Sequence, residues 1–299
     1  MSLVFAVPGK TFLAGEYLAL NEGPALLFLS QPCFELTAKP GKGEVEGLHQ
    51  NSPAGLFIRK HTDYFAKLDI AFQDPHKGIG GFGASTAQFL SVYALWLYKE
   101  AAQQDMEKIL DFKHILEEYY QVAWNGQGLR PSGADVVGQL KGSLTFFEKR
   151  QGLINVKSWP FTGLDFYLIH TGNKVATHEH LRMLKKFDTA NLEFAFSKIK
   201  ESFDSANENQ FIDGIKSYAK ALKDLNFTCE PTLNLLSDLQ SIPGVRAAKG
   251  CGALGADVVL VITKKDFSQG VKQYCEINGL KMLASNKDIA AGLQVRGNL

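Results

Sequence analysis

Short apolar runs, bounded by polar and turn-forming residues, divide the first half of the chain. The runs have the length of β-strands and cover residues 3–7, 12–20, 24–29, 34–38, 143–148 and 153–158. Pro8-Gly9 predicts a turn after the first run, and Asn21-Glu22-Gly23 predicts a hairpin turn between the second and the third. The polar, glycine-containing stretch 41–53 predicts a surface loop.

Other stretches of this half have helical periodicity. Residues 57–72 follow a helical pattern, and two later segments place apolar side chains at i, i+3, i+4, i+7 and i+8. These positions are Phe89, Val92, Tyr93, Trp96 and Leu97 in one segment, and Phe112, Ile115, Leu116, Tyr119 and Tyr120 in the other. Each set forms one face of an amphipathic helix, and Gly126 is the predicted C-cap of the second helix.

Beyond Pro160 the order of predicted elements changes. The pattern predicts a strand at 165–171, three or four helices between residues 179 and 241, and a second strand at 258–263. A helix ending at Ile277 and strands near 280–284 and 293–295 follow. The chain is therefore predicted to be an α+β protein whose two halves meet near residues 159–164.

Composition excludes several classes of protein. The chain has 299 residues, of which 45% are hydrophobic and 21% charged, so a packed core is expected. The formal net charge is only +1, from 32 basic and 31 acidic side chains. Nucleic-acid and membrane-surface binding need a sustained field of one sign, so neither is predicted as a partner.

Cysteine spacing and the absence of long apolar runs predict a cytoplasmic protein. The four cysteines are widely spaced and form no C-x-x-C pair, which favours reduced thiols. Residues 1–10 are too short and too soon interrupted by Pro8-Gly9-Lys10 for a signal peptide. No run of about 18 apolar residues exists that could span a membrane.

A glycine-dense loop at residues 78–86 carries the strongest chemical signal. Glycines let the backbone approach a ligand, and consecutive amides in such a turn bind anions. A helix is predicted directly afterwards, so its positive end points at the loop, and Ser85 and Thr86 add hydroxyls there. For the loop alone, a turn that caps a core helix is an equal interpretation.

Two other nucleotide motifs do not fit. Gly78-x-Gly80-Gly81-x-Gly83 formally satisfies G-x-G-x-x-G, but the residues before it, 73–77, form no buried strand, which disfavours a dinucleotide site. Gly9-Lys10-Thr11 lacks the earlier glycine of a Walker A loop, because Val4 stands at that position.

Three further segments accompany this loop. Gly250-Cys251-Gly252-Ala253-Leu254-Gly255 is a second glycine cluster, placed before its predicted strand. Pro131-Ser132-Gly133-Ala134-Asp135 puts a carboxylate after a tight turn, where an aspartate is more often an N-cap than a catalyst. Pro8-Gly9-Lys10 with Gly15-Glu16-Tyr17 supplies a cation, which alone would simply be solvated.

Together, the four segments resemble the GHMP kinases over nearly the whole chain. Residues 7–10 and 15–17 resemble the first motif of that superfamily, residues 81–87 its G-L-G-S-S-A-A phosphate loop, and residues 249–257 its third, glycine-rich motif. The resemblance implies a two-domain fold with the active site between the domains. Residues 1–160 would be like ribosomal protein S5 domain 2, and residues 161–299 would be ferredoxin-like.

Within the superfamily, the chain resembles phosphomevalonate kinases. Residues 131–135 match a P-S-G-x-D segment whose aspartate lies beside the acceptor hydroxyl, and Tyr17 stands where mevalonate kinases usually have histidine. His170-Thr171-Gly172 with Thr177 is similar to a T-G-x(4)-T substrate loop. Trp124 replaces the magnesium-binding glutamate of mevalonate kinases, which phosphomevalonate kinases also lack.

Some positions depart from the family pattern. Ala84 replaces the first serine of the phosphate loop, and Ala253 and Leu254 replace glycines of the third motif. These changes leave a catalytically silent nucleotide-binding homologue as an alternative, beside mevalonate kinase and diphosphomevalonate decarboxylase. A zinc site at His178-x-His180 is disfavoured, because the spacing puts the two rings on different sides of a helix.

The resemblance implies roles for individual residues. Asp135 is the expected catalytic base, with Lys10 beside it, and the expected cofactors are ATP and Mg²⁺, with Ser85 as a metal ligand. The residues expected to hold ATP are Gly81, Gly83, Ala84, Ser85, Thr86 and Gly252. The residues expected around a small-molecule phosphoryl acceptor are Glu16, Tyr17, Ser132, Gly133, Thr171 and Gly172.

Overall fold

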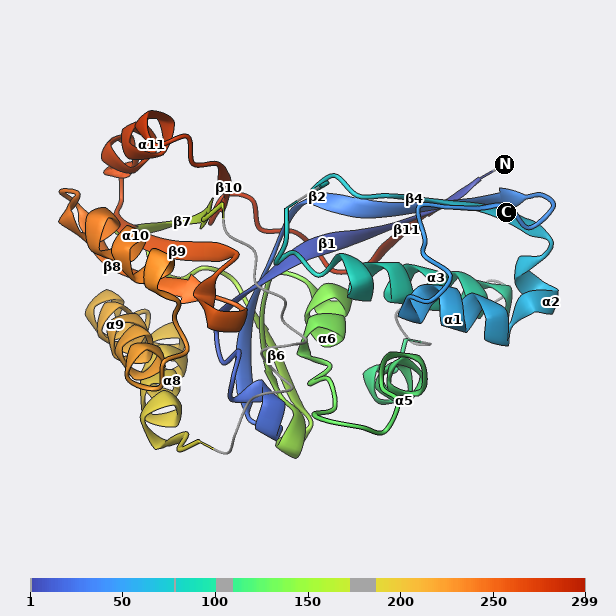
Figure 1. Cartoon of the computed structure of the whole chain (residues 1–299), viewed down its shortest axis with the longest axis horizontal. Helices are drawn as coiled ribbons and strands as arrows, with labels where there is room; N and C mark the ends of the chain where they lie inside the picture. The colour runs from blue at the N-terminus through green and yellow to red at the C-terminus, as the bar shows by residue number, and fades with distance from the viewer. Residues whose placement is uncertain (1, 78, 101–109, 173–186, 299) are drawn as a thin grey trace.

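Two β-sheets, each covered by helices, lie side by side in the molecule (Figure 1). The computed structural model describes residues 2–77, 79–100, 110–172 and 187–298. Within these ranges no helix combines the length and the apolar character that a membrane-spanning helix needs.

The first sheet has seven strands and contains both ends of the chain. Its strands are β1 (Leu3–Ala14), β2 (Pro24–Pro40), β3 (Val45–Glu46), β4 (Leu68–Gln73), β5 (Leu144–Glu148), β6 (Leu153–Lys157) and β11 (Gln294–Gly297). The order is β11-β1-β2-β4-β3, and β5 and β6 continue from the other end of β2. The long β2 makes this possible, because residues 35–40 pair with β4 and residues 24–28 pair with β5.

Helices cover one face of this sheet (Figure 1). They are α1 (Pro53–Lys60), α2 (Thr62–Phe65), α3 (Ala84–Glu100), α5 (Phe112–Ala123) and α6 (Ala134–Lys141). The first hydrophobic core lies between the sheet and these helices, and it includes Phe5 from β1, Phe34 from β2 and Phe89 from α3, all fully buried.

The second sheet is antiparallel and has helices on both faces. Its order is β10-β7-β9-β8, from β7 (Leu164–His170), β8 (Val245–Cys251), β9 (Val258–Lys264) and β10 (Met282–Ser285). The accompanying helices are α8 (Ala190–Ser205), α9 (Glu208–Asp224), α10 (Glu230–Ser241) and α11 (Ser268–Ile277). Successive residues of a strand point to opposite faces. Leu260 therefore packs with α8 and α9, and Val261 with α10 and α11.

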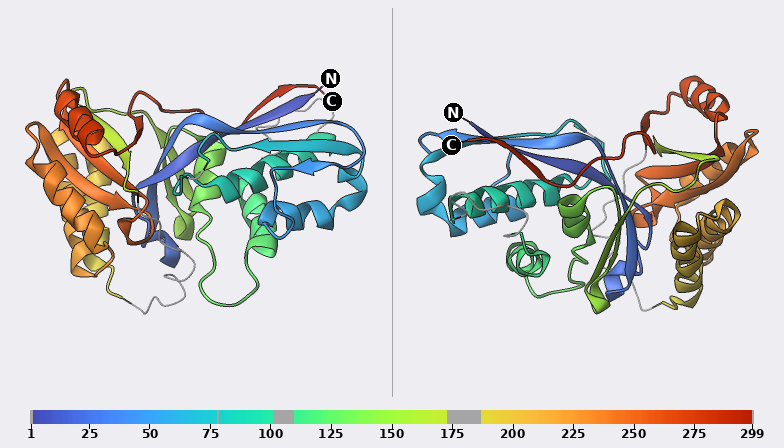
Figure 2. Two further views of the ribbon diagram at one scale, coloured as in Figure 1. Left: turned by 45° about the horizontal axis from the view of Figure 1, so that its top comes forward. Right: turned by 180° about the vertical axis from the view of Figure 1, so that it is seen from behind.

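The two sheets share a hydrophobic core. This core combines Leu26 and Phe28 of β2 with Phe166 of β7 and with apolar residues of α8 and α9. The rings of Phe28 and Phe166 meet edge to face, with centroids 4.9 Å apart. The last strand, β11, also crosses back to the first sheet and pairs with β1 (Figure 2). This strand therefore belongs to the first sheet, although the sequence predicts that residues 161–299 form the second half of the fold.

Two of the predicted strand boundaries are wrong. Pro8-Gly9 is no turn: β1 runs from Leu3 to Ala14 and accommodates the pair in a register shift between Val7 and Gly9. A bulge tolerates a proline because one residue there makes no ladder hydrogen bond. Likewise, the predicted strands 24–29 and 34–38 are parts of one strand, β2.

Two predictions about helices are also wrong. The helical pattern of residues 57–72 ends at Phe65, and β4 follows with Leu68, Ile70 and Phe72 buried at a period of two. The C-cap of α5 is Trp124 and not Gly126. Strand β8 was not predicted, because its small residues form no apolar run; the second glycine cluster forms the end of β8 and most of the turn to β9.

We expect Phe166→Ala to destabilise the whole chain, because its fully buried ring belongs to the core that both sheets share. Loss of a buried phenylalanine ring typically costs about 3–5 kcal/mol. Urea unfolding followed by circular dichroism measures the effect. Phe194→Ala is the matched control, because that ring is 61% exposed and its removal should change the free energy of unfolding by less than about 1 kcal/mol. Equal effects of the two substitutions would contradict the shared core.

Candidate active site

Lys10 lies on β1 directly against the glycine-dense loop. Its backbone N–H donates a hydrogen bond to the carbonyl of Phe82 (3.0 Å). Gly83 has a φ of +77°, and a Cβ atom added there would lie 2.9 Å from Lys10 Cγ. Glycine is therefore needed at position 83 both for the backbone conformation and for the close approach of the lysine stem.

Asp135 meets Lys10 from the first turn of α6. Asp135 Oδ2 lies 3.0 Å from Lys10 Nζ, and the two side chains are 28% and 12% exposed. The N-cap of α6 is Gly133, whose φ is +78°, so Asp135 is not the cap of this helix. The second carboxylate oxygen, Oδ1, is buried and has no hydrogen-bond partner among the described residues. A buried acceptor without a partner is costly, and it suits an incoming donor.

Gln139 connects these elements, and the sequence analysis did not identify it. Its side-chain amide donates to the carbonyls of Pro8 (2.9 Å) and Gly83 (3.2 Å), while its Oε1 accepts from the Thr86 hydroxyl (2.7 Å). Gln139 is fully buried and lies four residues after Asp135, on the same face of α6. The i, i+4 spacing from Asp135 was the only feature of the sequence that could have indicated a role for Gln139. The network uses the hydroxyl of Thr86, which is buried, as a structural group.

The first amides of α3, directly after the glycine-dense loop, have no acceptor within the helix. The first helical hydrogen bond runs from Ala87 N–H to Gly83 O (3.0 Å), so the amides of residues 84–86 have no acceptor within the helix. The helix dipole adds partial positive charge at this end, which favours an anion. Ser85 is exposed at this turn, so its hydroxyl is accessible to a ligand.

The loop that follows β8 packs against the glycine-dense loop from the second sheet. Cβ atoms added to Gly80 and Gly81 would lie 3.0 Å and 3.3 Å from side-chain atoms of Asp257. Thr171 binds the same loop, with its N–H donating to Asp257 O (3.1 Å) and its hydroxyl to Ala256 O. Residues 80–81, 171 and 256–257 therefore form one contiguous region.

Glu16 and Tyr17 lie deeper than expected for residues that touch a substrate. Glu16 forms an ion pair with Lys249, with 2.8 Å between Oε1 and Nζ. Tyr17 is 2% exposed, stacks on Phe227 with ring centroids 4.1 Å apart, and its hydroxyl accepts from Leu254 N–H (3.0 Å). Burial raises the pKa of Tyr17 far above its usual value, so the phenol stays neutral. Both polar side chains are used in contacts with the second half of the chain.

The remaining predicted residues lie at the margin of the site. Ser132 is half-buried, and its hydroxyl accepts from Ala134 N–H (3.3 Å) at the start of α6. Gly172 and Gly252 have positive φ, and among the described residues no atom apart from those of their chain neighbours lies within 4 Å of a Cβ added at either position. Thr177, His178 and His180 lie outside the described residues.

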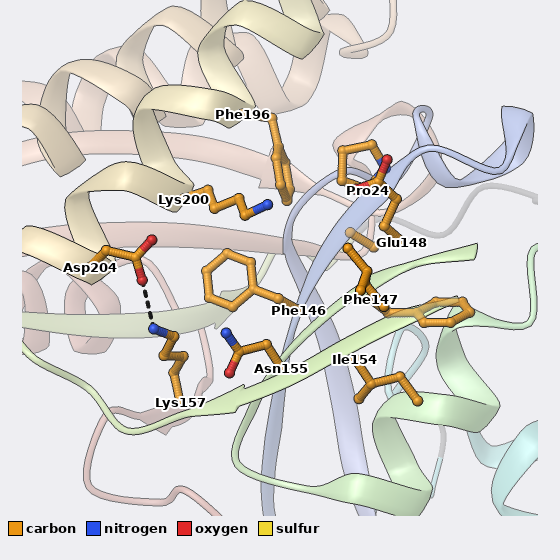
Figure 3. A pocket seen from close by; sticks show the side chains of 12 residues that line it. Pro24, Phe146, Phe147, Glu148, Ile154, Asn155, Lys157, Phe196, Lys200 and Asp204 are labelled. Atoms are coloured by element: carbon orange, nitrogen blue, oxygen red, sulfur yellow. Dashed lines mark hydrogen bonds and ion pairs between the residues drawn. The ribbon is translucent and has the colours of Figure 1, made fainter. Parts of the chain in front are cut away.

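A separate groove lies away from these residues (Figure 3). It has a volume of about 240 Å³ and runs between the β5–β6 hairpin and α8. Phe146 and Phe196 line it, together with the ion pair of Lys157 and Asp204, whose charged atoms are 2.6 Å apart. None of the residues predicted for the nucleotide or the acceptor contributes to this groove.

Similar folds occur among solved structures. A Lin0012 protein from Listeria innocua matches with a TM-score of 0.78 and 17% identity over 100% of both chains. The phosphomevalonate kinase of Streptococcus pneumoniae, in complex with phosphomevalonate and AMPPNP, matches with a TM-score of 0.75 and 16% identity, over 95% of this chain and 99% of that chain. The galactokinase of Lactococcus lactis, complexed with galactose, matches with a TM-score of 0.76 and 14% identity, over 98% of this chain and 95% of that chain.

The chain has the GHMP kinase fold. This confirms the fold predicted from the motifs, an α+β chain with the two-sheet architecture of these kinases. No protein-family model and no curated protein matches the sequence. Lys10 contacts both Asp135 and the glycine-dense loop.

We expect acid to destabilise the protein through His76, which supports the glycine-dense loop. The His76 ring stacks on Phe82, with centroids 4.1 Å apart and an angle of 4° between planes. Burial lowers the pKa of His76 below its usual 6.5, although Pro32 O and Asp74 act in the opposite direction. The neutral ring therefore contributes stability above about pH 6.5 that is lost as the pH falls through the lowered pKa.

Urea unfolding of wild type and His76→Gln at about pH 7.5 and about pH 5.5 tests this expectation. The variant should lose less stability on acidification than wild type, because it lacks the titrating ring. His114→Gln is the control, since that ring is 56% exposed, and it should keep the wild-type pH dependence. An unchanged pH dependence in His76→Gln would exclude this role for His76.

Proposed function

We propose that the protein is an ATP-dependent small-molecule kinase that phosphorylates phosphomevalonate. The observation that carries this proposal is the contact of Lys10 with Asp135 beside the glycine-dense loop and the start of α3. A cation, a carboxylate with a free oxygen and amides at the start of a helix are groups that phosphoryl transfer needs at one place.

The residues present fit a nucleotide triphosphate. Gly81 and Gly83 have positive φ, which lets Asp257 and Lys10 pack closely against the loop, and the amides of residues 84–86 have no acceptor within α3. These amides would hold the phosphates of ATP, with Gly252 contributed by the turn after β8. The exposed hydroxyl of Ser85 would ligate Mg²⁺, which neutralises charge on the phosphates when it is bound.

Asp135 would orient the acceptor hydroxyl and take its proton. Its Oδ1 atom is buried without a described partner, so it can accept the hydrogen bond of that hydroxyl. The acceptor oxygen then forms a bond to the γ-phosphorus of ATP, the bond from that phosphorus to the ADP oxygen breaks, and the proton passes to Asp135. Lys10 balances the carboxylate charge and offsets the charge of the transferring phosphoryl group.

The choice of phosphomevalonate is supported by the motif resemblance. Thr171 and Gly172 lie beside the 256–257 loop, and Ser132 and Gly133 lead into Asp135 from the other half of the chain. The S. pneumoniae phosphomevalonate kinase matches nearly the full length of this chain. Mevalonate kinase and diphosphomevalonate decarboxylase are the alternatives, since they share the phosphate loop and the aspartate.

One observation favours a catalytically silent homologue. Leu254 has a φ of +52°, a conformation that glycine adopts freely and leucine rarely does. It stands where the resembled motif has glycine, two residues after Gly252. A leucine side chain there could limit access of the nucleotide.

Asp135→Asn should lower kcat about a hundred- to ten-thousand-fold while nucleotide affinity stays near wild type, because only the proton acceptor is lost. Coupled ADP-release assays measure kcat, and calorimetry with a non-hydrolysable ATP analogue measures affinity. Asp204→Asn is the matched control, because that carboxylate is 59% exposed in the separate groove, and it should keep full activity. Near-normal turnover by Asp135→Asn would refute the assignment.

The same assay with different acceptors tests the substrate. Phosphomevalonate should support turnover at least about tenfold better in kcat/KM than mevalonate or diphosphomevalonate, since a matched polar site discriminates strongly. Galactose and homoserine serve as unrelated acceptors. Binding of ATP without turnover on any acceptor would instead establish the silent homologue.

A further inference from the structure

Three consecutive residues after β1 are each bound by the second half of the chain. Gly15 N–H donates to the Tyr218 hydroxyl (2.9 Å), Glu16 pairs with Lys249 (2.8 Å), and the Tyr17 hydroxyl accepts from Leu254 N–H (3.0 Å). We call residues 15–17 the latch. The latch connects the segment that continues the strand of Lys10 to β8 and to the loop after it.

The central contact of the latch is an ion pair away from water. The Lys249 side chain is fully buried and that of Glu16 is 5% exposed. Burial lowers the pKa of Lys249, but the neighbouring Cys251 and Glu16 outweigh this effect and leave the pKa above its usual value. Cys251 Sγ lies 3.6 Å from Lys249 Nζ, and burial raises the thiol pKa to about 11. The thiol is therefore protonated at neutral pH, and Glu16 is the counter-ion of Lys249.

Stability alone does not account for such a pair. Desolvation of two charges offsets most of their attraction, so replacing a buried ion pair by neutral groups of similar volume is often neutral or stabilising. The cost is increased here because Glu16 Oε2 is buried without a hydrogen-bond partner among the described residues. A directional contact of this kind fixes geometry more strongly than it stabilises the fold.

The ion pair links two segments that border the candidate site. Glu16 follows Lys10 by six residues along the segment that continues β1, and Lys249 lies near the end of β8, just before the loop 252–257. That loop contacts Gly80 and Gly81 through Asp257. The ion pair is therefore one of the contacts that relate the position of the loop 252–257 to that of Lys10.

We propose that Glu16 and Lys249 are positioning residues that hold the loop 252–257 against the nucleotide site. This inference rests on the proposed function for its kinetic readout only. A displacement of about 1 Å in a reacting group can cost about a hundredfold in rate, so loss of the pair should reduce turnover although neither residue touches the substrate.

The test is the double variant Glu16→Gln/Lys249→Met, which removes both charges and keeps the volumes. We expect its midpoint of thermal unfolding to equal or exceed that of wild type. Its kcat should fall about ten- to hundredfold, with KM for ATP changed more than KM for the acceptor. Lys157→Met/Asp204→Asn is the matched control, because it neutralises an exposed ion pair in the separate groove and should leave both constants unchanged.

Hydrogen exchange gives a readout that does not depend on activity. Amides of residues 252–257 should exchange faster in the Glu16→Gln/Lys249→Met variant, while those of β9 stay protected. If wild type turns over no acceptor, the proposed function fails, and the exchange experiment alone decides the inference. Unchanged exchange in this loop, or a loss of activity that only parallels a loss of thermal stability, would overturn it.

Discussion

The ion pair of Lys10 and Asp135 exists only because three elements with distant origins in the sequence meet at one point. Lys10 comes from the interior of β1 and Asp135 from the first turn of α6. The glycine-dense loop, which contacts Lys10, directly precedes α3. The fully buried Gln139 holds the same three elements together through their backbone carbonyls and the hydroxyl of Thr86. The positions of Lys10 and Asp135 are thus supported by the neutral hydrogen bonds of Gln139.

The second half of the chain contributes a loop that packs against the candidate site. Its loop after β8 packs on the glycine-dense loop through Asp257, and the latch of residues 15–17 determines where that loop lies. The shared core of Phe28 and Phe166 supplies the bulk of the contact, which is apolar and has no preferred direction. The buried hydrogen bonds and the ion pair of the latch require specific directions, so they fix how the two halves of the chain are placed, which apolar packing alone does not.

Much of this arrangement could be predicted from the sequence, since the glycine-dense loop, Lys10 and Asp135 belong to short local patterns. Gln139 could not, because a lone glutamine in a helix normally indicates an exposed position. The burial of Glu16 was equally hidden, since its partner Lys249 lies 233 positions away and a charged residue gives no sign of burial. β8 was missed because its alanines and glycine form no apolar run. Tertiary contacts, and not local preference, decide these positions.

The pairing of β11 with β1 has a consequence for how the chain folds. One of the two neighbours of β1 in the sheet is formed by residues 294–297, far away in the sequence (Figure 2). The first sheet is therefore incomplete until this distant segment has reached β1, and contacts of such high sequence separation form slowly. Until then one edge of the strand that bears Lys10 has unpaired backbone groups, and such an edge can pair with another chain.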